Sequence, residues 1–336
     1  MMRVSAGTAV ALKLLNWKMQ EYPTTAYFLQ TVDYEDGKYE ESCLMGCKFC
    51  PLSSSSMGTR DRLSRIIWPA FPRKTLERAL LHVHEVGIRR ICLQGTRRKE
   101  SMNALTTALS WISSRVSTPV SVSAWLENIH EVDRLIQAGA ERVSIALDVA
   151  SPREYSRVKG GFLQKRLEFL LEAAQNYPGC ITTHLICGLG ETEEELLQVA
   201  HDLLREDVTV ALFAFTPVKG TPLANYSPPE PSAYRRVQAA LHLLRRHSVN
   251  LSSFRFYQGK LISLGRDRQN LREALEKGAA FETVGCAYCN RPYYNERPGG
   301  FFYNYPRPLT SQEEEENYNL LWDSLGGQAA CSASHK

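Results

Sequence analysis

The chain has 336 residues, of which 43% are hydrophobic and 23% are charged. This is an ordinary globular composition, and it excludes a collagen-like, mucin-like or wholly disordered protein. Forty Lys and Arg against 36 Asp and Glu give a net charge of +4, which is too small to indicate a nucleic-acid partner. A membrane span is not predicted either, because no uncharged apolar stretch reaches the required length of about 18 residues. The length fits one large α/β barrel or two smaller domains.

Residues 1–23 are interpreted as an N-terminal extension with a short helix, because Lys13 interrupts a faint likeness to a secretion signal. From residue 24 onward, apolar runs of strand length alternate with helical stretches, which predicts parallel βαβ units. The strands are predicted at 24–32, 89–95, 119–126, 141–148, 180–188, 208–215, 250–257 and 280–285. The helices are predicted at 76–87, 102–114, 130–140, 164–177, 192–206, 231–247 and 270–279.

The predicted strands are rich in Val, Ile, Leu and Phe without a strict period of two, as expected when helices cover them. Seven or eight strand–helix units favour a barrel over an open doubly wound sheet. The predicted fold class is therefore α/β, with a parallel (β/α) barrel of six to eight strands over residues 24–296. Residues 297–336 form a C-terminal segment with an acidic helix and a disordered tail.

Nine cysteines are too few for a disulfide scaffold. Three of them crowd into one loop, Cys43-x3-Cys47-x2-Cys50, and two more form the pair Cys286 and Cys289. Clustered thiols without an extracellular signature indicate a reducing compartment, which we take to be the cytoplasm, and metal or redox chemistry.

The loop directly after the first strand carries the strongest signal for chemistry. Three thiolates at this spacing can reach three corners of an iron–sulfur cube, and Gly46 lets the chain turn tightly. An iron without a protein ligand can then chelate a substrate by its amine and carboxylate. With the aromatic Phe49 before the last cysteine, the loop resembles the signature of the radical SAM superfamily. The alternative is a structural zinc site that joins Cys47 and Cys50 to the second cysteine pair, because such sites need four ligands.

The resemblance extends over roughly residues 40–290 and is closest to the biotin synthase-like branch. It implies a 4Fe–4S cluster on Cys43, Cys47 and Cys50, S-adenosyl-L-methionine (SAM) as cofactor, and a 5′-deoxyadenosyl radical. It also implies contacts to SAM from residues at the strand ends, for which a turn, a helix cap or a solvated charge is the alternative. These residues are Phe49, Gln94, Gly95, Asp148, Arg166, Ile186, Gly188 and Glu191. Three of these residues, Ile186, Gly188 and Glu191, match the motif Gly-x-Ile-x-Gly-x-x-Glu that the family carries at its fifth strand. His184 departs from this motif, because it replaces the first glycine.

The pair Cys286 and Cys289 is expected at the carboxyl end of an eighth strand, across the barrel mouth from the first cluster. There it would hold an auxiliary iron–sulfur cluster, with Cys92 matching a cluster cysteine of biotin synthase. The other cysteine positions of biotin synthase are Val120 or Ser121 and Thr182 in this chain, so that site is not copied intact. A disulfide or a zinc knuckle is the alternative.

The segment after Cys289 resembles the C-terminal segment of the two-component lipoyl synthases. The resemblance implies a sulfurtransferase that thiolates an unactivated carbon of a protein-bound octanoyl chain by means of a sacrificial auxiliary cluster. Substrate contacts are expected at the barrel mouth from Asn290, Arg291, Tyr293, Tyr294 and Asn295.

The same resemblance implies several partners. They are an octanoylated carrier protein, which Arg97, Arg98 and Lys99 would receive, a second radical SAM subunit, and a ferredoxin- or flavodoxin-like electron donor. Two other functions remain open. One is a mutase or cofactor-assembly enzyme of the same branch, and the other is a zinc-binding protein without enzymatic activity.

Overall fold

A computed structural model describes residues 1–326 except 31, 34–38, 41–42, 248 and 298. The expected disordered tail therefore lies outside the described residues from position 327 onward. None of the described helices has the length and apolarity needed to cross a bilayer. The predicted acidic helix is present as α10 (Ser311–Ser324).

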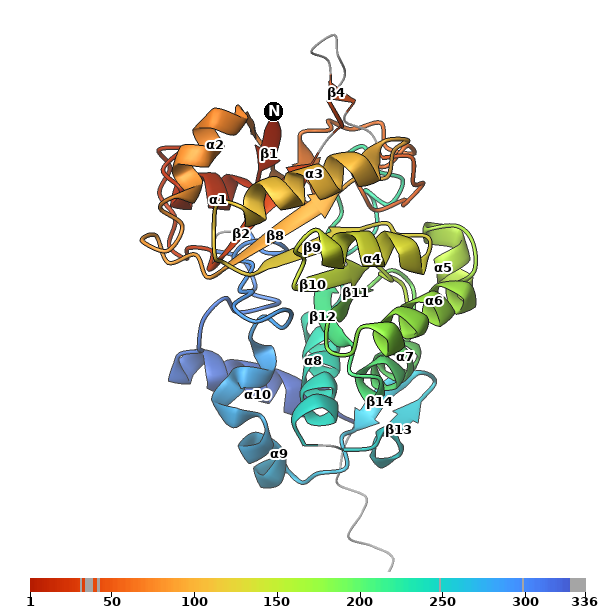
Figure 1. Cartoon of the computed structure of the whole chain (residues 1–336). Helices are drawn as coiled ribbons and strands as arrows, with labels where there is room; N and C mark the ends of the chain where they lie inside the picture. The colour runs from red at the N-terminus through yellow and green to blue at the C-terminus, as the bar shows by residue number, and fades with distance from the viewer. Residues whose placement is uncertain (31, 34–38, 41–42, 248, 298, 327–336) are drawn as a thin grey trace, which may run out of the picture.

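One sheet of eight strands organises the molecule, in the order β12-β11-β10-β9-β8-β2-β1-β7 (Figure 1). Six neighbouring strands run parallel in chain order, as the alternating pattern predicts for a (β/α) barrel. They are β2 (Thr25–Gln30), β8 (Arg90–Gly95), β9 (Val120–Ala124), β10 (Arg142–Ile145), β11 (Ile181–Cys187) and β12 (Thr209–Ala214).

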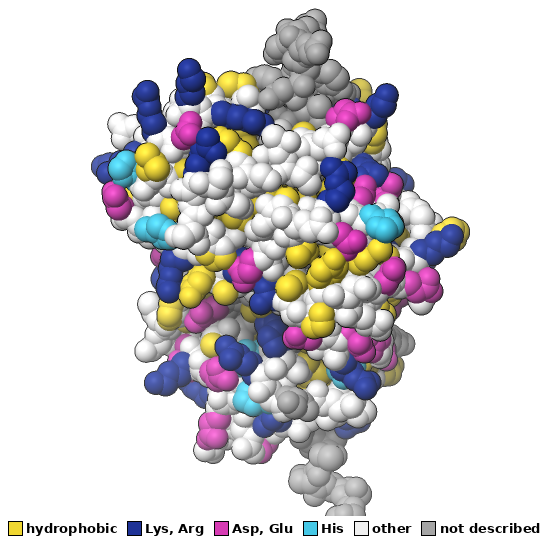
Figure 2. All heavy atoms as spheres, viewed as in Figure 1, with side chains coloured by type: hydrophobic (Ala, Val, Ile, Leu, Met, Phe, Trp, Pro, Cys, Tyr) yellow, Lys and Arg dark blue, Asp and Glu magenta, His cyan; other side chains and the backbone are white. Residues whose placement is uncertain are grey.

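Helices connect these parallel strands and cover the outer side of the sheet (Figure 1). They are α2 (Arg73–Leu80), α3 (Ser101–Ser113), α4 (Ile129–Gln137), α5 (Pro152–Val158), α6 (Leu163–Asn176) and α7 (Glu193–Arg205). After β12, α8 (Pro231–Arg246) packs against α7 and α10, and α9 (Arg268–Ala274) and the 3₁₀ turn η2 (Glu276–Phe281) follow it in the chain. Lys and Arg side chains are interspersed with Asp and Glu over the face in Figure 2.

The N-terminal extension differs from the prediction, because it contributes to the sheet. Besides the helix α1 (Ala6–Ala11), it forms β1 (Met2–Val4), which pairs antiparallel with β2 and with β7 (Ala70–Phe71). All three residues of β1 are buried. So short a strand gives no periodic signal, and only its long-range pairing defines it.

The predicted seventh and eighth strands are not part of the sheet. The seventh instead forms the hairpin β13 (Arg255–Tyr257) with β14 (Lys260–Ser263). In the eighth, Phe281 is buried within η2, and Glu282 makes a single bridge to Tyr305. The apolar residues there serve the helical layer around α8, so their pattern does not indicate a strand.

In place of these strands, residues 283–296 bridge the outer parallel strands β2 and β12. At the amino end of β2, the hydroxyls of Thr24 and Thr25 donate to the Tyr288 carbonyl at 2.6 and 2.9 Å. At the carboxyl end of β12, the Asn295 side-chain amide donates to the Ala214 carbonyl at 2.7 Å. The segment therefore closes the side of the barrel and runs along its whole height.

Gly220→Ala tests how the loop behind the cysteines is held. Gly220 has φ +89°, and a Cβ there would lie 2.3 Å from the Gly58 Cα. We expect a loss of about 1–2 kcal/mol from the left-handed backbone, and about 1–3 kcal/mol more from overpacking against backbone that cannot move aside. The measurement is urea unfolding of the variant against the wild type.

Gly160→Ala is the matched control for this substitution. Gly160 has φ +82°, but a Cβ there meets no heavy atom within 4 Å. The Gly160→Ala variant should therefore lose only the roughly 1–2 kcal/mol of unfolding free energy that the left-handed backbone costs. Equal destabilisation by the two variants would show that the contact between Gly58 and Gly220 does not hold the loop.

Candidate active site

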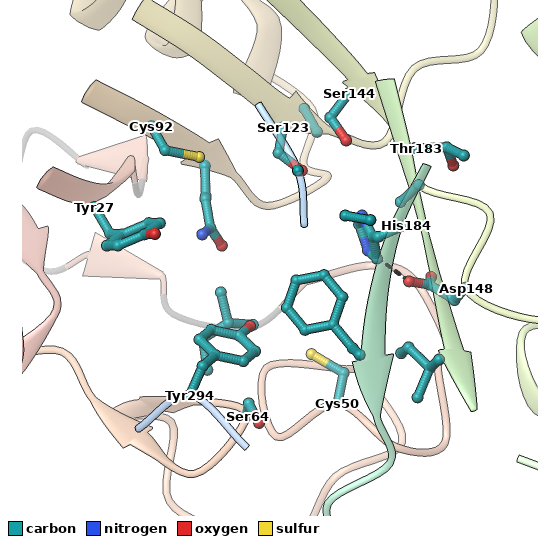
Figure 3. A pocket seen from close by; sticks show the side chains of 18 of the residues that line it. Tyr27, Cys50, Ser64, Cys92, Ser123, Ser144, Asp148, Thr183, His184 and Tyr294 are labelled. Atoms are coloured by element: carbon teal, nitrogen blue, oxygen red, sulfur yellow. Dashed lines mark ion pairs between the residues drawn. The ribbon is translucent and has the colours of Figure 1, made fainter. Parts of the chain in front are cut away.

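One cavity of about 280 Å³ occupies the interior of the barrel. Alternate residues of the parallel strands face it, because successive side chains of a strand point to opposite sides. Most of its lining is apolar, including Leu29, Leu52, Val122, Ala211 and Phe213. Hydroxyl groups interrupt this lining, and Ser123, Ser144 and Thr183 are among those labelled in Figure 3. The cavity is the volume in which the predicted chemistry must take place.

The cysteine loop lies at the carboxyl end of the barrel, where Cys43, Cys47 and Cys50 all line the cavity. The Arg97 backbone N–H, directly after β8, donates to the Cys43 Sγ at 3.2 Å. Burial raises the pKa of Cys47 to about 11, and it raises the pKa of Cys50 further, with the neighbouring cysteines adding to both effects. The three thiols thus face one space, and burial makes ionisation of Cys47 and Cys50 unfavourable unless a cation is bound beside them.

A buried charged group lies next to this loop. The Asp148 carboxylate is within 2.5 Å of the Lys159 ammonium and 2.6 Å of His184 Nε2 (Figure 3). Burial opposes its ionisation, but the Lys159 and His184 side chains hold the pKa of Asp148 well below its usual range. Asp148 also has φ +65°, which is uncommon outside glycine. Lys159 and His184 both line the cavity, and neither was predicted as a site residue.

His184 carried a signal that the sequence analysis noted without using. It interrupts a glycine position of the strand-five motif, and in β11 it alternates with residues that face the helices. Its ring lies 5.4 Å from the Phe213 ring, which in turn lies 5.2 Å from the Tyr294 ring. These rings form a continuous aromatic wall from β11 to the C-terminal segment. Lys159 gave no comparable signal, because only the fold brings α5 next to β10.

The residues predicted to contact SAM divide into two groups. Five line the cavity beside the cysteine loop, namely Phe49, Gln94, Gly95, Asp148 and Ile186. The other three, Arg166, Gly188 and Glu191, do not line it. The Glu191 carboxylate accepts the backbone N–H groups of Gly188 and Leu189 at 2.7 and 3.0 Å, so it stabilises its own turn. The cofactor-binding roles of all eight residues stay predictions.

Arg166 lies one layer behind the cavity. Its guanidinium stacks 4.1 Å from the ring centre of Trp125, which lines the cavity, and it donates to the Leu126 and Ala146 carbonyls. One of its nitrogens, Nη2, is buried without a hydrogen-bond partner among the described residues. Arg166 is therefore not a solvated helix-face charge.

A second group of thiols lies at the other end of the same cavity, where Cys92, Cys286 and Cys289 all line it. Cys289 Sγ is 3.3 Å from the Tyr27 hydroxyl, and the Ser121 hydroxyl is 3.5 Å from Cys286 Sγ. Figure 3 shows Cys92 and Tyr27 on one side of the cavity and Cys50 on another. Burial raises the pKa of Cys92 and of Cys289, and charge interactions with Cys286 raise both further.

The position of the second pair corrects the sequence-based expectation. Cys286 and Cys289 were expected at the carboxyl end of the barrel, but they lie where the strands begin. The Ala287 carbonyl accepts a 2.7 Å hydrogen bond from Arg90, the first residue of β8. The reason is that the chain enters from the amino end as an irregular segment instead of crossing as an eighth strand.

The predicted substrate residues are also only partly at the cavity. Arg291, Tyr294 and Asn295 line it, whereas Asn290 and Tyr293 do not. Asn290 accepts from the Thr24 backbone N–H and donates to the Tyr22 carbonyl, both at 2.9 Å, so it fixes the segment to the start of β2. Tyr293 packs against Phe302 instead.

The basic triplet Arg97, Arg98 and Lys99, which follows β8, exposes less unpaired positive charge than the sequence led us to expect. Arg97 forms ion pairs with Glu127 at 2.5 Å and with Glu131 at 2.8 Å. Arg98 is buried, and only Lys99 is exposed. The triplet is therefore not a continuous basic surface.

Asp148→Asn and Lys159→Met each break the buried ion pair and leave the other group without its partner. We expect each to lower the free energy of unfolding by about 3–5 kcal/mol. The double variant should lose less than the sum, because it leaves neither charge behind. Urea unfolding of the four proteins measures this coupling, and strict additivity would contradict it.

The stability difference between wild type and Asp148→Asn should become smaller at low pH. Because folding lowers the pKa of Asp148, the advantage of wild type over Asp148→Asn should be complete above about pH 4, the range of an unfolded aspartate. It should decline as the pH falls further. The exposed control Asp202→Asn should stay within about 0.5 kcal/mol of wild type.

Comparisons with known proteins agree with this geometry. Residues 41–203 match the family described as the radical SAM superfamily. The chain is 27% identical over 211 residues to the biotin synthase of Synechococcus sp. (strain JA-3-3Ab), covering 60% of this chain and 65% of that protein. It is 24% identical over 173 residues to the lipoyl synthase of Corynebacterium urealyticum, covering 48% of this chain and 46% of that protein.

Among solved structures, the FeFe-hydrogenase maturase HydG from Carboxydothermus hydrogenoformans has a similar fold. Its TM-score is 0.51 at 16% identity, covering 80% of this chain and 60% of that chain. The radical SAM family implies a 4Fe–4S cluster and SAM. Residues 41–203, which carry the cysteine loop at the carboxyl end of the barrel, therefore form a radical SAM domain, and the chain is similar to biotin synthase and lipoyl synthase.

Proposed function

We propose that this chain is a radical SAM enzyme that inserts sulfur into an unactivated carbon of a protein-bound octanoyl chain, as a component of a lipoyl synthase. The observation that carries the proposal is the presence of two cysteine triplets at opposite ends of one cavity. Cys43, Cys47 and Cys50 lie at its carboxyl end, and Cys92, Cys286 and Cys289 lie at its amino end. A substrate between them would be within reach of both.

The first triplet fits a 4Fe–4S cluster. All three thiols line one cavity, and the Arg97 backbone N–H already points at the Cys43 Sγ. Hydrogen bonds to cluster sulfurs are a general means by which proteins orient and tune such clusters. Three thiolates also leave one iron free, whereas a closed structural zinc site needs four ligands.

The second triplet fits an auxiliary iron–sulfur cluster by the same reasoning. Its thiols are surrounded by the Tyr27 hydroxyl, the Ser121 hydroxyl and two buried guanidinium groups, Arg90 and Arg291. Both guanidiniums lower the pKa of Cys92 and Cys289 against the larger effect of burial. Burial nevertheless keeps both pKa values raised, so a bound metal would be needed to displace the protons at this end.

When bound, the first cluster and SAM supply the 5′-deoxyadenosyl radical that abstracts hydrogen, and the auxiliary cluster supplies sulfur. The protein contributes position and shielding. The aromatic wall of His184, Phe213 and Tyr294 and the C-terminal segment line the cavity, and we propose that they limit the access of water to a bound substrate. Radical chemistry needs this separation, because solvent and stray C–H bonds would otherwise react first.

The apolar part of the lining suits an alkyl chain. Two exposed apolar side chains also lie on the loop that carries the first cysteines, Leu44 at 60% and Met57 at 93% exposure. We propose that an octanoylated carrier domain docks at this end, with a second radical SAM subunit and a ferredoxin- or flavodoxin-like donor as further partners, in the reducing cytoplasm. The main competing function is a mutase or cofactor-assembly enzyme of the same branch. A mutase needs no second cluster.

Cysteine variants separate the two clusters. In Cys286→Ser and Cys289→Ser, we expect the iron and sulfide content per chain to fall, sulfur insertion to be lost, and 5′-deoxyadenosine formation from SAM to remain. Cys47→Ser should lose all activities, because the radical is no longer made. Iron analysis and chromatography of the nucleoside products after anaerobic reconstitution measure these outcomes.

Cys180→Ser is the matched control, because Cys180 is half-buried at the start of β11 and does not line the cavity. It should keep the wild-type iron content and activity. If Cys286→Ser also kept both, the second cluster would be excluded. A colourless zinc-loaded protein after reconstitution would instead support the non-enzymatic alternative.

The substrate is tested by anaerobic incubation with SAM, reductant and an octanoyl-lysine peptide, followed by mass spectrometry. The expected product is the peptide with added sulfur, formed together with 5′-deoxyadenosine. An unchanged peptide, with 5′-deoxyadenosine formed only in the presence of another acceptor, would contradict the lipoyl assignment and leave the radical chemistry standing.

A further inference from the structure

A separate group of metal-ligating side chains, distinct from both cysteine triplets, lies outside the cavity, between the end of α8 and the turn after α9. It consists of His242, His247 and Glu276, whose ligand atoms all lie within 4.8 Å of one another. The Glu276 Oε1 is 3.8 Å from His242 Nε2 and 3.9 Å from His247 Nε2. None of these residues lines the barrel cavity, so the cluster has no part in the proposed sulfur chemistry.

His242 provides the independent sign that a ligand is missing. The residue is only 5% exposed, and its Nε2 is buried without a hydrogen-bond partner among the described residues. Buried polar atoms nearly always have a partner, and an orphaned one carries a penalty of about 1–3 kcal/mol. This nitrogen faces Glu276, yet their separation is too long for a hydrogen bond. A bound ion between them would satisfy both groups.

We propose that His242, His247 and Glu276 bind a divalent metal ion of the Zn²⁺ type. Imidazole and carboxylate are ligands that Zn²⁺ takes, usually four in a tetrahedron. Metal–ligand distances near 2.0–2.2 Å place tetrahedral ligands about 3.4 Å apart. The two Glu276–histidine separations would therefore have to shorten by about half an ångström, and the separation between the two histidines by at most about 1.4 Å. The Ala274 carbonyl, 3.0 Å from His247 Nε2, is placed to be the fourth ligand.

The surroundings supply further negative potential for a cation. His247 is the residue at the carboxyl end of α8, and Ala274 is the last residue of α9. Two helix carboxyl ends, each with unpaired carbonyls and the negative end of the helix dipole, therefore meet at this point. Burial also lowers the pKa of His242, which favours the neutral imidazole that a metal requires. Against this, Arg245 and Arg246 are nearby positive charges.

The position of the site gives it a structural consequence. Glu276 begins η2, and the chain from η2 leads directly into residues 283–296, which close the barrel and carry Cys286 and Cys289. Glu276 and Lys277 are non-glycine residues with φ +50° and +55°, a conformation that costs energy unless the surroundings hold it. A metal joining α8 to Glu276 would fix the start of the closing segment.

Titration calorimetry with Zn²⁺ tests the proposal on the full chain after its iron–sulfur clusters have been loaded, so that the cysteines are occupied. Wild type should bind one equivalent. His242→Gln, His247→Gln and Glu276→Gln should each weaken this binding by at least the roughly 10–100-fold effect of losing an outer-shell partner. Glu276→Gln keeps the side-chain shape, so it stays informative if the more buried His242 variant fails to fold.

The matched control is His130→Gln. His130 also lies near a carboxylate, 3.8 Å from Asp133, but its side chain is 87% exposed and it belongs to no such cluster. It should bind Zn²⁺ like wild type. Co²⁺ in place of Zn²⁺ should give a visible spectrum without sulfur-to-metal charge transfer. Absence of a bound equivalent in wild type, undiminished binding in all three variants, or a sulfur-ligated Co²⁺ spectrum would overturn the proposal.

Discussion

The closure of the barrel by residues 283–296 is the constraint on which the rest of the site depends. Six parallel strands leave a gap between β2 and β12, and the segment fills it without forming a strand. Arg90 is central to this contact, because it is 2% exposed and its guanidinium donates to the Ala287 carbonyl, the Ser121 hydroxyl and the Glu141 carboxylate at 2.6–2.7 Å. One buried side chain thus joins the closing segment to two strands. Loss of any of these bonds would leave a charged donor unsatisfied.

This closure explains why the molecule can hold two thiol groups in one interior. Cys92 comes from β8, which the sequence pattern places securely, but it gains sulfur neighbours only through the irregular segment. Without Cys286 and Cys289 it would be a partly buried thiol packed against Tyr27, Leu29, Leu52 and Trp68, which is an ordinary hydrophobic environment for cysteine. The second metal-ligand set is therefore a property of the tertiary structure.

The elements that local periodicity defines were predictable, and those that long-range contacts define were not. The six parallel strands and the helices between them follow from apolar runs and amphipathic stretches. The cysteine loop could be predicted as a metal site because its three thiols are close in sequence. By contrast, β1 has three residues and is defined only by its pairing with β2 and β7.

The wrong predictions at the site have the same origin, because they also concern a segment that long-range contacts define. Residues 280–285 are apolar enough to resemble a strand, but a run of that length can equally serve a helical layer, and here it does. Asn290 and Tyr293 were grouped with Arg291, Tyr294 and Asn295 because they are adjacent in sequence. In an irregular segment, neighbours point in different directions, so sequence proximity does not select the side chains that face a cavity.

Different charged groups act on the two sets of thiols. At the carboxyl end, Lys159 is the nearest cation to Cys47, but its ammonium is bound to Asp148 and to two backbone carbonyls. Asp148 raises the pKa of Cys47 while Lys159 lowers it, so the pair contributes little net positive potential. The raised pKa values of Cys47 and Cys50 mean that a bound metal would have to replace their protons.

At the amino end, the Arg291 guanidinium lies 3.8 Å above the Phe213 ring and donates to the Leu212 and Val284 carbonyls. It is thus held by an aromatic face and by neutral acceptors, and it also interacts with the buried Glu296 carboxylate. That charge acts on Cys92 and Cys289 together. The Arg90 and Arg291 charges thus offset part of the cost of ionising Cys92 and Cys289, but burial still raises both pKa values, so metal binding must displace the protons at this end too.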